Sequence, residues 1–149
     1  MIFTIGHSTR SFEEFINILK KFEINLLVDV RRFPKSTKYP HFNKEFLQEE
    51  LPKHGIHYLH YPELGGFRKE GYENFAKSKE FTDALFNLLK IIDTKITVIM
   101  CAEVLWWRCH RRFIANKLVE LGNEVFHIFD QNKLQVHEQK QNKLRCDRI

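Results

Sequence analysis

Ile96-Thr97-Val98-Ile99-Met100-Cys101-Ala102-Glu103 is a run of β-forming residues that ends in a thiol and a carboxylate. The run is apolar on both faces, which is typical of a central strand in a parallel sheet that helices cover on both sides. A second polar group, Cys109-His110-Arg111, follows at the start of a predicted helix that Gly122 would end. Reactive side chains this close together indicate a site where a ligand is bound or transformed.

The N-terminal part of the chain predicts a strand, a helix and a second strand. Met1 to Ile5 and Leu26 to Val30 are short apolar runs. Between them, Ser11 opens a capping box, and apolar residues recur at helical spacing to about Phe22. A strand, a helix and a strand within about thirty residues form a right-handed βαβ unit with parallel strands.

The chain continues to alternate between helices and strands. Helices are predicted from Asn43 to about Lys53 and after the capping residue Ser78, and strands at Ile56 to Tyr61 and Val125 to Phe129. This order predicts a single α/β domain over residues 1–130. Its architecture would be a three-layer sandwich with a mainly parallel central sheet of about five strands and helices on both faces.

Composition limits the classes of partner and compartment. The net charge of +5 and the pI of about 9.1 favour an anionic small molecule or nucleic acid as partner, although many soluble proteins are mildly basic without a functional reason. Three cysteines do not make a disulfide framework, no apolar run reaches membrane-spanning length, and no signal peptide precedes the first strand. We therefore expect a cytoplasmic protein with no membrane partner. Residues 131–149 are expected to form a polar, basic C-terminal tail with little regular structure.

Polar side chains and glycines follow several of the predicted strands, and in a parallel sheet these positions meet at the carboxyl edge, where such folds bind ligands. They are His7, Ser8, Asp29, Arg31, Gly65, Gly66, Cys101 and Glu103. The two glycines suit a turn that needs a positive φ, or a close approach of the backbone to a ligand. Arg31 also begins a basic, aromatic loop that ends at Lys44, a composition that suits phosphates and stacked bases but also an ordinary solvated loop.

Cys101 stands where a nucleophile on a strand-to-helix loop would stand, because a helix N-terminus and nearby arginines lower a thiol pKa. The loop has no glycine and places Arg108 seven residues later, unlike the anion-cradling cysteine loop of phosphatases and sulfurtransferases, so a buried structural cysteine is the simpler interpretation. Cys101, Cys109 and His110 lack the spacing of a structural zinc site. A disulfide between Cys101 and Cys109 is an open alternative.

Asp29, Glu103 and His7 are candidates for proton transfer, and the two carboxylates could instead hold a divalent ion. Arg31 and Arg111 could clamp a phosphate or carboxylate between them, with Arg111 in the first turn of a helix. The alternative interpretation is that each carboxylate forms a salt bridge with an arginine and only fixes the loops.

Taken together, the motifs resemble the domain of unknown function 488 family over nearly the whole chain. They are Thr4-Ile5-Gly6-His7-Ser8, Val28-Asp29-Val30-Arg31 with Pro34 and Ser36, Phe42-Asn43, Tyr58, Leu64-Gly65-Gly66, Cys101-Ala102-Glu103, Trp107-Arg108-Cys109-His110-Arg111 and His127-Ile128. The resemblance implies an α/β domain in which these motifs are the functional positions. It implies no particular reaction.

Three functions are compatible with the sequence. The first is an enzyme, a hydrolase or transferase acting on a phosphate-bearing substrate such as a nucleotide or nucleic acid, with the catalytic residues His7, Asp29, Glu103 and Cys101. Its ligand-binding residues would be Ser8, Arg31, Ser36, Gly65, Gly66, Cys109, His110 and Arg111. No metal ligand is assigned; a divalent metal is compatible with the sequence and zinc is disfavoured. The alternatives are a non-catalytic nucleic-acid-binding or regulatory module and a thiol-based redox or sulfur-transfer protein.

Overall fold

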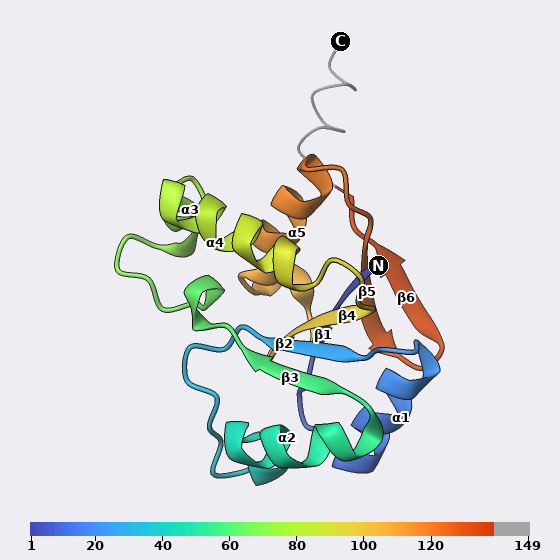
Figure 1. Cartoon of the computed structure of the whole chain (residues 1–149). Helices are drawn as coiled ribbons and strands as arrows, with labels where there is room; N and C mark the ends of the chain where they lie inside the picture. Colours follow the sequence, from blue (N-terminus) through green and yellow to red (C-terminus); the bar gives the residue numbers. More distant parts are fainter. Residues whose placement is uncertain (139–149) are drawn as a thin grey trace.

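A computed structural model gives the structure of residues 1–138, a six-stranded sheet with helices on both faces (Figure 1). The strands are β1 (Ile2–Gly6), β2 (Leu26–Asp29), β3 (His57–His60), β4 (Thr97–Cys101), β5 (Val125–Asp130) and β6 (Lys133–Val136). The α-helices are α1 (Phe12–Lys21), α2 (Lys44–Glu50), α3 (Tyr72–Phe75), α4 (Lys79–Ile91) and α5 (Arg111–Glu120). Short 3₁₀ segments occupy Pro40–Phe42, Leu51–His54, Pro62–Leu64 and Trp106–Arg108.

The strand order is β3-β2-β4-β1-β5-β6, and every neighbouring pair is parallel except β5 and β6. The predicted α/β class with a mainly parallel sheet is therefore confirmed, with one strand more than the five expected. β4 pairs with both β1 and β2, which makes it an interior strand, as its apolar composition predicts.

Two apolar layers hold the helices on the sheet. Phe15 and Leu19 of α1 and Leu47 of α2 are buried against one face. Leu85 of α4 and Leu118 of α5 are buried on the other, so α1 and α2 lie below the sheet in Figure 1 and α4 and α5 above it. None of the helices formed by residues 1–138 has both the length and the apolar character needed to span a bilayer.

Helix boundaries follow the local chemistry of the chain. Ser78 caps α4 by accepting a hydrogen bond from the backbone N–H of Phe81, as predicted. Asn43 occupies the N-cap position of α2, but its side chain makes no capping bond and instead accepts the backbone N–H of Ser36. The amide of Asn43 therefore fixes the loop before α2 instead of the helix itself.

The expectation of little regular structure after residue 130 is wrong for Lys133–Val136. This segment forms β6, which pairs antiparallel with β5, and His137 just after it is buried. Lys133 to Val136 alternates polar and apolar residues, but four residues are too short a run to stand out, and all four are exposed, so pairing with β5 is what mainly defines the strand. The rest of the predicted tail, residues 139–149 with Cys146, lies outside the described residues.

The connections that leave β1 and β4 depart to opposite faces of the sheet. α1 follows β1 on one face, whereas α5 follows β4 on the other, and the two strands are neighbours. In open α/β sheets, a crevice forms beyond the carboxyl ends of strands at such a switch point. The fold therefore places a crevice beside Gly6 and Cys101, the last residues of these strands.

Candidate functional site

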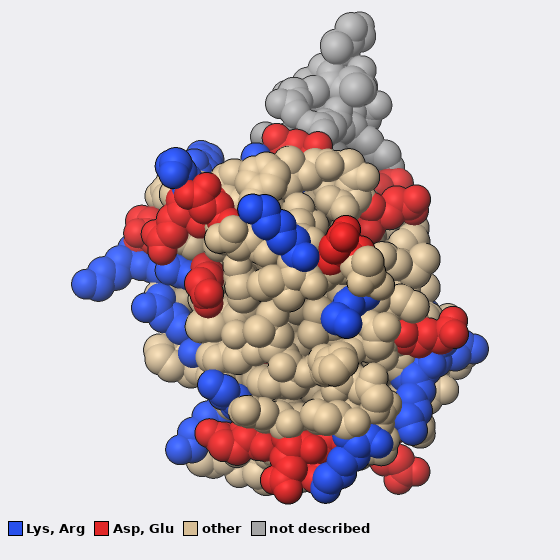
Figure 2. All heavy atoms as spheres, in the orientation of Figure 1, with Lys and Arg blue, Asp and Glu red and all other residues tan. Residues whose placement is uncertain are grey.

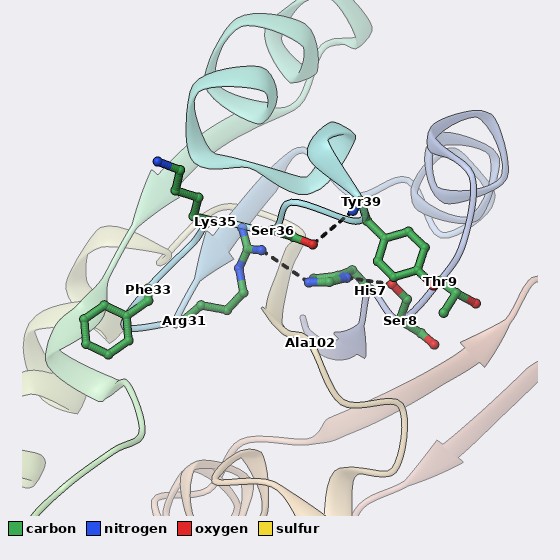
Figure 3. Close-up of a pocket in the computed structure, with 9 residues that line it drawn as sticks. All are labelled: His7, Ser8, Thr9, Arg31, Phe33, Lys35, Ser36, Tyr39 and Ala102. Carbon is green, nitrogen blue, oxygen red and sulfur yellow. Dashed lines mark hydrogen bonds between the residues drawn. The ribbon is translucent and has the colours of Figure 1, made fainter.

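A pocket of about 380 Å³ opens beyond the carboxyl ends of the strands, a volume within the roughly 300–1,000 Å³ range of small-molecule sites. It is lined by His7, Ser8, Thr9, Arg31, Phe33, Lys35, Ser36, Tyr39 and Ala102 (Figure 3). These residues follow β1, β2 and β4, so the pocket lies at the switch point. None of the described residues that line it is acidic, which makes it suited to an anion.

Arg31 is held at the base of this pocket by a buried ion pair with Asp29. Its Nε donates to Oδ1 of Asp29 over 2.8 Å, and its Nη2 donates to Oδ2 over 2.7 Å, a bidentate pair in which Asp29 is fully buried. Nη2 also donates to the carbonyl of Phe42, and Nη1 lies 3.2 Å from Nε2 of His7. Four of the five guanidinium N–H groups thus have partners, and one Nη1 N–H is left for a ligand.

Asp29 has no capacity left for chemistry of its own. Besides the guanidinium, it accepts the backbone N–H of Arg31 and the hydroxyl of Tyr58, the latter over 2.6 Å. Burial and the neighbouring Asp29 charge raise the pKa of the Tyr58 hydroxyl, which keeps Tyr58 a hydrogen-bond donor. The role that this geometry supports for Asp29 is to orient Arg31, which is the salt-bridge alternative considered for the sequence.

His7 is a buried imidazole whose tautomer is defined by its partners. Nδ1 lies 2.9 Å from the carbonyl of Ser8, which can only accept, so Nδ1 carries the proton and Nε2 accepts from Arg31. Desolvation lowers the pKa of His7 to about 4, and the nearby Arg31 charge acts in the same direction. The ring stacks on Phe42 with centroids 4.3 Å apart. At neutral pH, His7 is therefore a fixed, uncharged group beside a cation.

The backbone around Ser8 is tied to the end of β4. The N–H groups of His7 and Ser8 donate to the carbonyls of Cys101 and Ala102 over 2.9 and 3.0 Å. Ser8 has a φ of 51°, a left-handed conformation that is uncommon outside glycine and often found at functional sites. Gly6 has no side chain because a Cβ there would collide with the carbonyl of Glu103. This close crossing of two loops shapes one wall of the pocket.

The opposite wall is the basic loop that follows β2. Its Ser36 hydroxyl accepts the backbone N–H of Tyr39 over 3.0 Å and keeps its own O–H available to donate. Lys35 is exposed at the rim, where its side chain extends away from His7 (Figure 3). Phe33, also lining the pocket, is 66% exposed, and its ring lies 5.7 Å from the ring of Phe67.

Arg111 and Glu103 do not join this pocket. Arg111 is 1% exposed, and its Nη groups donate to Oγ1 of Thr4 and to the carbonyls of Glu103 and Val104. The expected clamp of Arg31 and Arg111 around one anion is therefore not formed, because Arg111 uses its donors to hold the loop after β4. The side chain of Glu103 is exposed, and it is the backbone of Glu103 that contacts Arg111.

Cys101, Cys109, His110 and Gly66 form a separate cluster. The Sγ atoms of the two cysteines are 3.0 Å apart, and Cys109 Sγ is 3.7 Å from Nδ1 of His110. A Cβ on Gly66 would lie 3.4 Å from Nδ1 of His110, so this glycine leaves room for the ring. Gly65 is buried, and a Cβ there would lie 3.0 Å from the Val30 carbonyl. The expected positive φ at these two glycines is wrong, since Gly65 has a φ of −73° and Gly66 is not among the residues with positive φ; close packing is what Gly65 serves. None of these residues lines the pocket of His7 and Arg31.

Within residues 1–138, no group of three or more His, Cys, Asp or Glu side chains is arranged to hold a metal ion. Four residues predicted from the sequence to bind or act on the ligand, His7, Ser8, Arg31 and Ser36, line the pocket. Thr9, Phe33 and Ala102 also line it and are not among the predicted site residues. Phe33 belongs to the basic, aromatic loop whose composition suits stacked bases but also an ordinary solvated loop, so composition alone does not single it out.

Comparison with known proteins gives one match. The family described as "Domain of unknown function DUF488" matches residues 11–118, which include Arg31, Ser36 and both cysteines of the cluster, whereas His7 and Ser8 precede the matched range. No curated protein and no solved structure matches the chain.

Proposed function

The chain belongs to the DUF488 family, whose name assigns no reaction, and we propose that it is an enzyme that binds a phosphate-bearing ligand in the pocket of His7 and Arg31. The observation that carries the proposal is the pairing of a fixed guanidinium with a neutral imidazole. Arg31 is oriented by a buried carboxylate and keeps one Nη1 N–H for a ligand oxygen. An oxygen bound there lies beside the ring of His7, a residue type able to transfer a proton.

Charge and hydrogen-bond donors in the pocket support an anion. Because Arg31 and Asp29 neutralise each other, the excess positive charge comes from Lys35 at the rim. The hydroxyls of Ser8 and Ser36 supply neutral donors on opposite walls. Phosphate oxygens accept several hydrogen bonds at once, and a guanidinium fork with hydroxyl donors is a common way to bind them.

Exposed aromatic rings beside the pocket support a nucleotide over a bare phosphate. Phe33 is 66% exposed and Phe67 is 81% exposed, and Phe67 adopts a φ of 59°, which a bulky residue rarely accepts. Nη1 of Arg32 donates to the carbonyl of Phe67 over 3.2 Å and holds that backbone in place. Exposed rings held in this way by an unfavourable backbone conformation are suited to stack on a base. Such stacking contributes about 1–3 kcal/mol per base in single-stranded sites.

His7 is the candidate proton-transfer residue of this enzyme. A negative ligand beside it would raise its depressed pKa, because the imidazolium would then be paired with a phosphate. A ligand oxygen that also accepts the second Nη1 N–H of Arg31, the one now directed at His7, would free Nε2 to accept a proton from a water or hydroxyl nucleophile. We propose a cytoplasmic hydrolase or transferase for phosphoesters, with Arg31 holding the anion and His7 as base.

The second candidate is a non-catalytic nucleic-acid-binding module, which one observation favours. Residues 31–44 contain five basic residues and no acidic residue. On the face drawn in Figure 2, however, Lys and Arg side chains alternate with Asp and Glu around a largely uncharged centre. A long nucleic acid needs a continuous basic track, which this face (Figure 2) does not show, whereas a small ligand or a strand end needs only the pocket.

Calorimetric titration with inorganic phosphate, the four nucleoside monophosphates and a short single-stranded oligonucleotide tests the proposal. Lys35→Gln should weaken nucleotide binding about threefold to tenfold, whereas Lys38→Gln, a cation of the same loop outside the pocket, should leave it unchanged. A phosphoester screen on wild type and His7→Gln tests turnover. An equal loss of affinity in the two lysine variants, a strong salt dependence of binding and no turnover would favour the nucleic-acid-binding module instead.

A further inference from the structure

The pair of thiols at the end of β4 is a second chemical site that the pocket does not use. Cys101 is 2% exposed, and Cys109, on the loop before α5, is partly exposed. Their Sγ atoms lie 3.0 Å apart, so a movement of about 1 Å would bring them to the disulfide bond length of about 2.05 Å. Neither sulfur faces the pocket of His7 and Arg31.

Three groups able to donate a hydrogen bond surround Sγ of Cys109. The sulfur accepts the backbone N–H of Arg111 over 3.3 Å and lies 3.7 Å from Nδ1 of His110. It lies 3.0 Å from Sγ of Cys101, whose single S–H can point to Cys109 or to the carbonyl of Glu103. Simple packing of a buried thiol does not require such donors, since a neutral sulfur is a weak acceptor. They are the environment of a thiolate at a helix N-terminus.

The two cysteines are electrostatically unequal. The hydrogen bond from Cys101 and then the contact with His110 hold the pKa of Cys109 well below its usual range. Burial raises the pKa of Cys101, which therefore keeps its proton. Such an arrangement separates an attacking thiolate from a protonated partner that reacts second.

We propose that Cys109 and Cys101 form a redox site in which a hydroperoxide oxidises the pair to a reversible intramolecular disulfide. The Cys109 thiolate attacks the peroxide, the O–O bond breaks, and an alcohol or water leaves with one proton from solvent, so that Cys109 becomes a sulfenic acid. The sulfur of Cys101 then attacks Cys109, the S–O bond breaks, and water leaves with the Cys101 proton. Two electrons pass from the sulfurs to the peroxide oxygens, and an external dithiol reverses the change.

Oxidation at this site would reach the pocket through the backbone. The carbonyls of Cys101 and Ala102 accept the N–H groups of His7 and Ser8, and Ala102 itself lines the pocket. The redox proposal nevertheless stands without the proposed ligand, because it depends only on the geometry of the two sulfurs.

Mass spectrometry of the full chain carrying Cys146→Ser tests the proposal, because only Cys101 and Cys109 then remain. After hydrogen peroxide, trypsin should release the peptide Ile96–Arg108 linked to Cys109–Arg111, lighter by two hydrogen atoms and separated by dithiothreitol. Free thiols throughout, or over-oxidised sulfurs without the linked peptides, would overturn the proposal.

Single variants assign the order of attack. Cys101→Ser, with Cys101→Ala as a second choice at this buried position, should trap a sulfenic acid on Cys109 that dimedone labels. In Cys109→Ser, dimedone should label Cys101 at least about tenfold more slowly than it labels Cys109 in Cys101→Ser. Equal labelling of the two variants would contradict the assigned roles, and unfolding curves establish that each variant is folded.

The pH dependence of alkylation by iodoacetamide distinguishes a thiolate from a structural cysteine. The alkylation rate of Cys109 should fall less than about threefold between pH 8 and pH 5.5. The alkylation rate of an ordinary thiol, with a pKa of about 8.5, falls more than about a hundredfold over the same range. A hundredfold loss at Cys109 would mean that the thiolate does not exist and would overturn the proposal.

Discussion

Nη1 of Arg31 lies 3.2 Å from Nε2 of His7, so a permanent cation and a neutral imidazole meet at the base of one pocket. Because Nδ1 of His7 is committed to the carbonyl of Ser8, the imidazole presents its lone pair to Arg31. The arrangement depends on Asp29, which fixes the guanidinium from below. Charge, orientation and a group able to accept a proton are thus supplied by residues that follow two different strands.

Replacing Asp29 by asparagine should destabilise the protein by about 3–5 kcal/mol, because Arg31 would keep a buried charge without its counter-ion. Urea denaturation measures the change. Asp83→Asn is the matched control, since its partner Lys79 is 90% exposed and the loss should be below about 1 kcal/mol. Similar losses in both variants would mean that the Asp29 pair carries no special share of the stability.

Gly6→Ala should destabilise the protein by about 2 kcal/mol or more, because the new methyl group would collide with the backbone of Glu103 and Val104. Gly66→Ala is the matched control: its methyl group would meet only the His110 ring, at 3.4 Å, and should cost less than about 1 kcal/mol. Thermal unfolding of both variants is the measurement. A Gly6 variant as stable as wild type would show that the loop after β4 can move away.

The periodicity of the chain was sufficient to predict the fold class and the central place of β4. The apolar run that forms β4 has apolar side chains on both faces, which favours burial under helices on both sides of the sheet. The strand pairs with a neighbour along each edge, β1 and β2. Strand order was beyond reach, because β1 and β2 follow one another in sequence yet are separated by β4. β6 is hard to predict because it has only four residues, and its two apolar side chains, Leu134 and Val136, are exposed and join no buried core.

The candidate site was predictable where backbone topology alone decides it. His7 and Arg31 follow parallel strands, so the sheet brings them together whatever their partners. Glu103 and Arg111 failed the same argument because Gly6 lets the loop after β4 cross close to β1. This crossing turns the carbonyl of Glu103 toward Arg111 and leaves its carboxylate in solvent. The contact between the Glu103 carbonyl and Arg111 depends on how two loops pack in space, and no periodic pattern in the sequence predicts it.

A buried chain of hydrogen bonds links α5 to β1 and to the end of β6. Arg111 donates to Thr4, Oγ1 of Thr4 lies 2.6 Å from Nδ1 of His127, and Nε2 of His127 lies 2.8 Å from Nδ1 of His137. Nε2 of His137 is 2.6 Å from Oδ1 of Asn116, which can only accept. The protons are therefore ordered along the chain, and both imidazoles are neutral.

Stability should fall as the pH drops from about 6.5 to about 4. Burial lowers the pKa of His7 and His137 to about 4 and that of His127 to about 2, so the unfolded chain, with ordinary histidines, binds protons first. Each histidine should contribute a slope of up to about 1.4 kcal/mol per pH unit in this window. Urea denaturation at a series of pH values gives the slope.

The matched variants separate this effect from general acid destabilisation. His137→Gln should remove roughly one histidine's share of the slope, whereas His57→Gln, at an exposed position, should leave the slope unchanged. A wild-type stability that stays flat between pH 6.5 and pH 5 would show that these imidazoles accept protons in the folded state.

A pH titration of the nuclear magnetic resonance signals of the His7 imidazole tests the central claim most directly. These signals are assigned by their absence from the spectrum of His7→Gln. In the free protein, we predict a neutral ring with the proton on Nδ1 and a pKa of about 4. Saturation with adenosine monophosphate should raise the pKa of His7 by at least about one unit, while His127, away from the pocket lining, stays unchanged. If His7 titrates identically with and without saturating nucleotide, its pocket does not hold the phosphate and the proposed function is wrong.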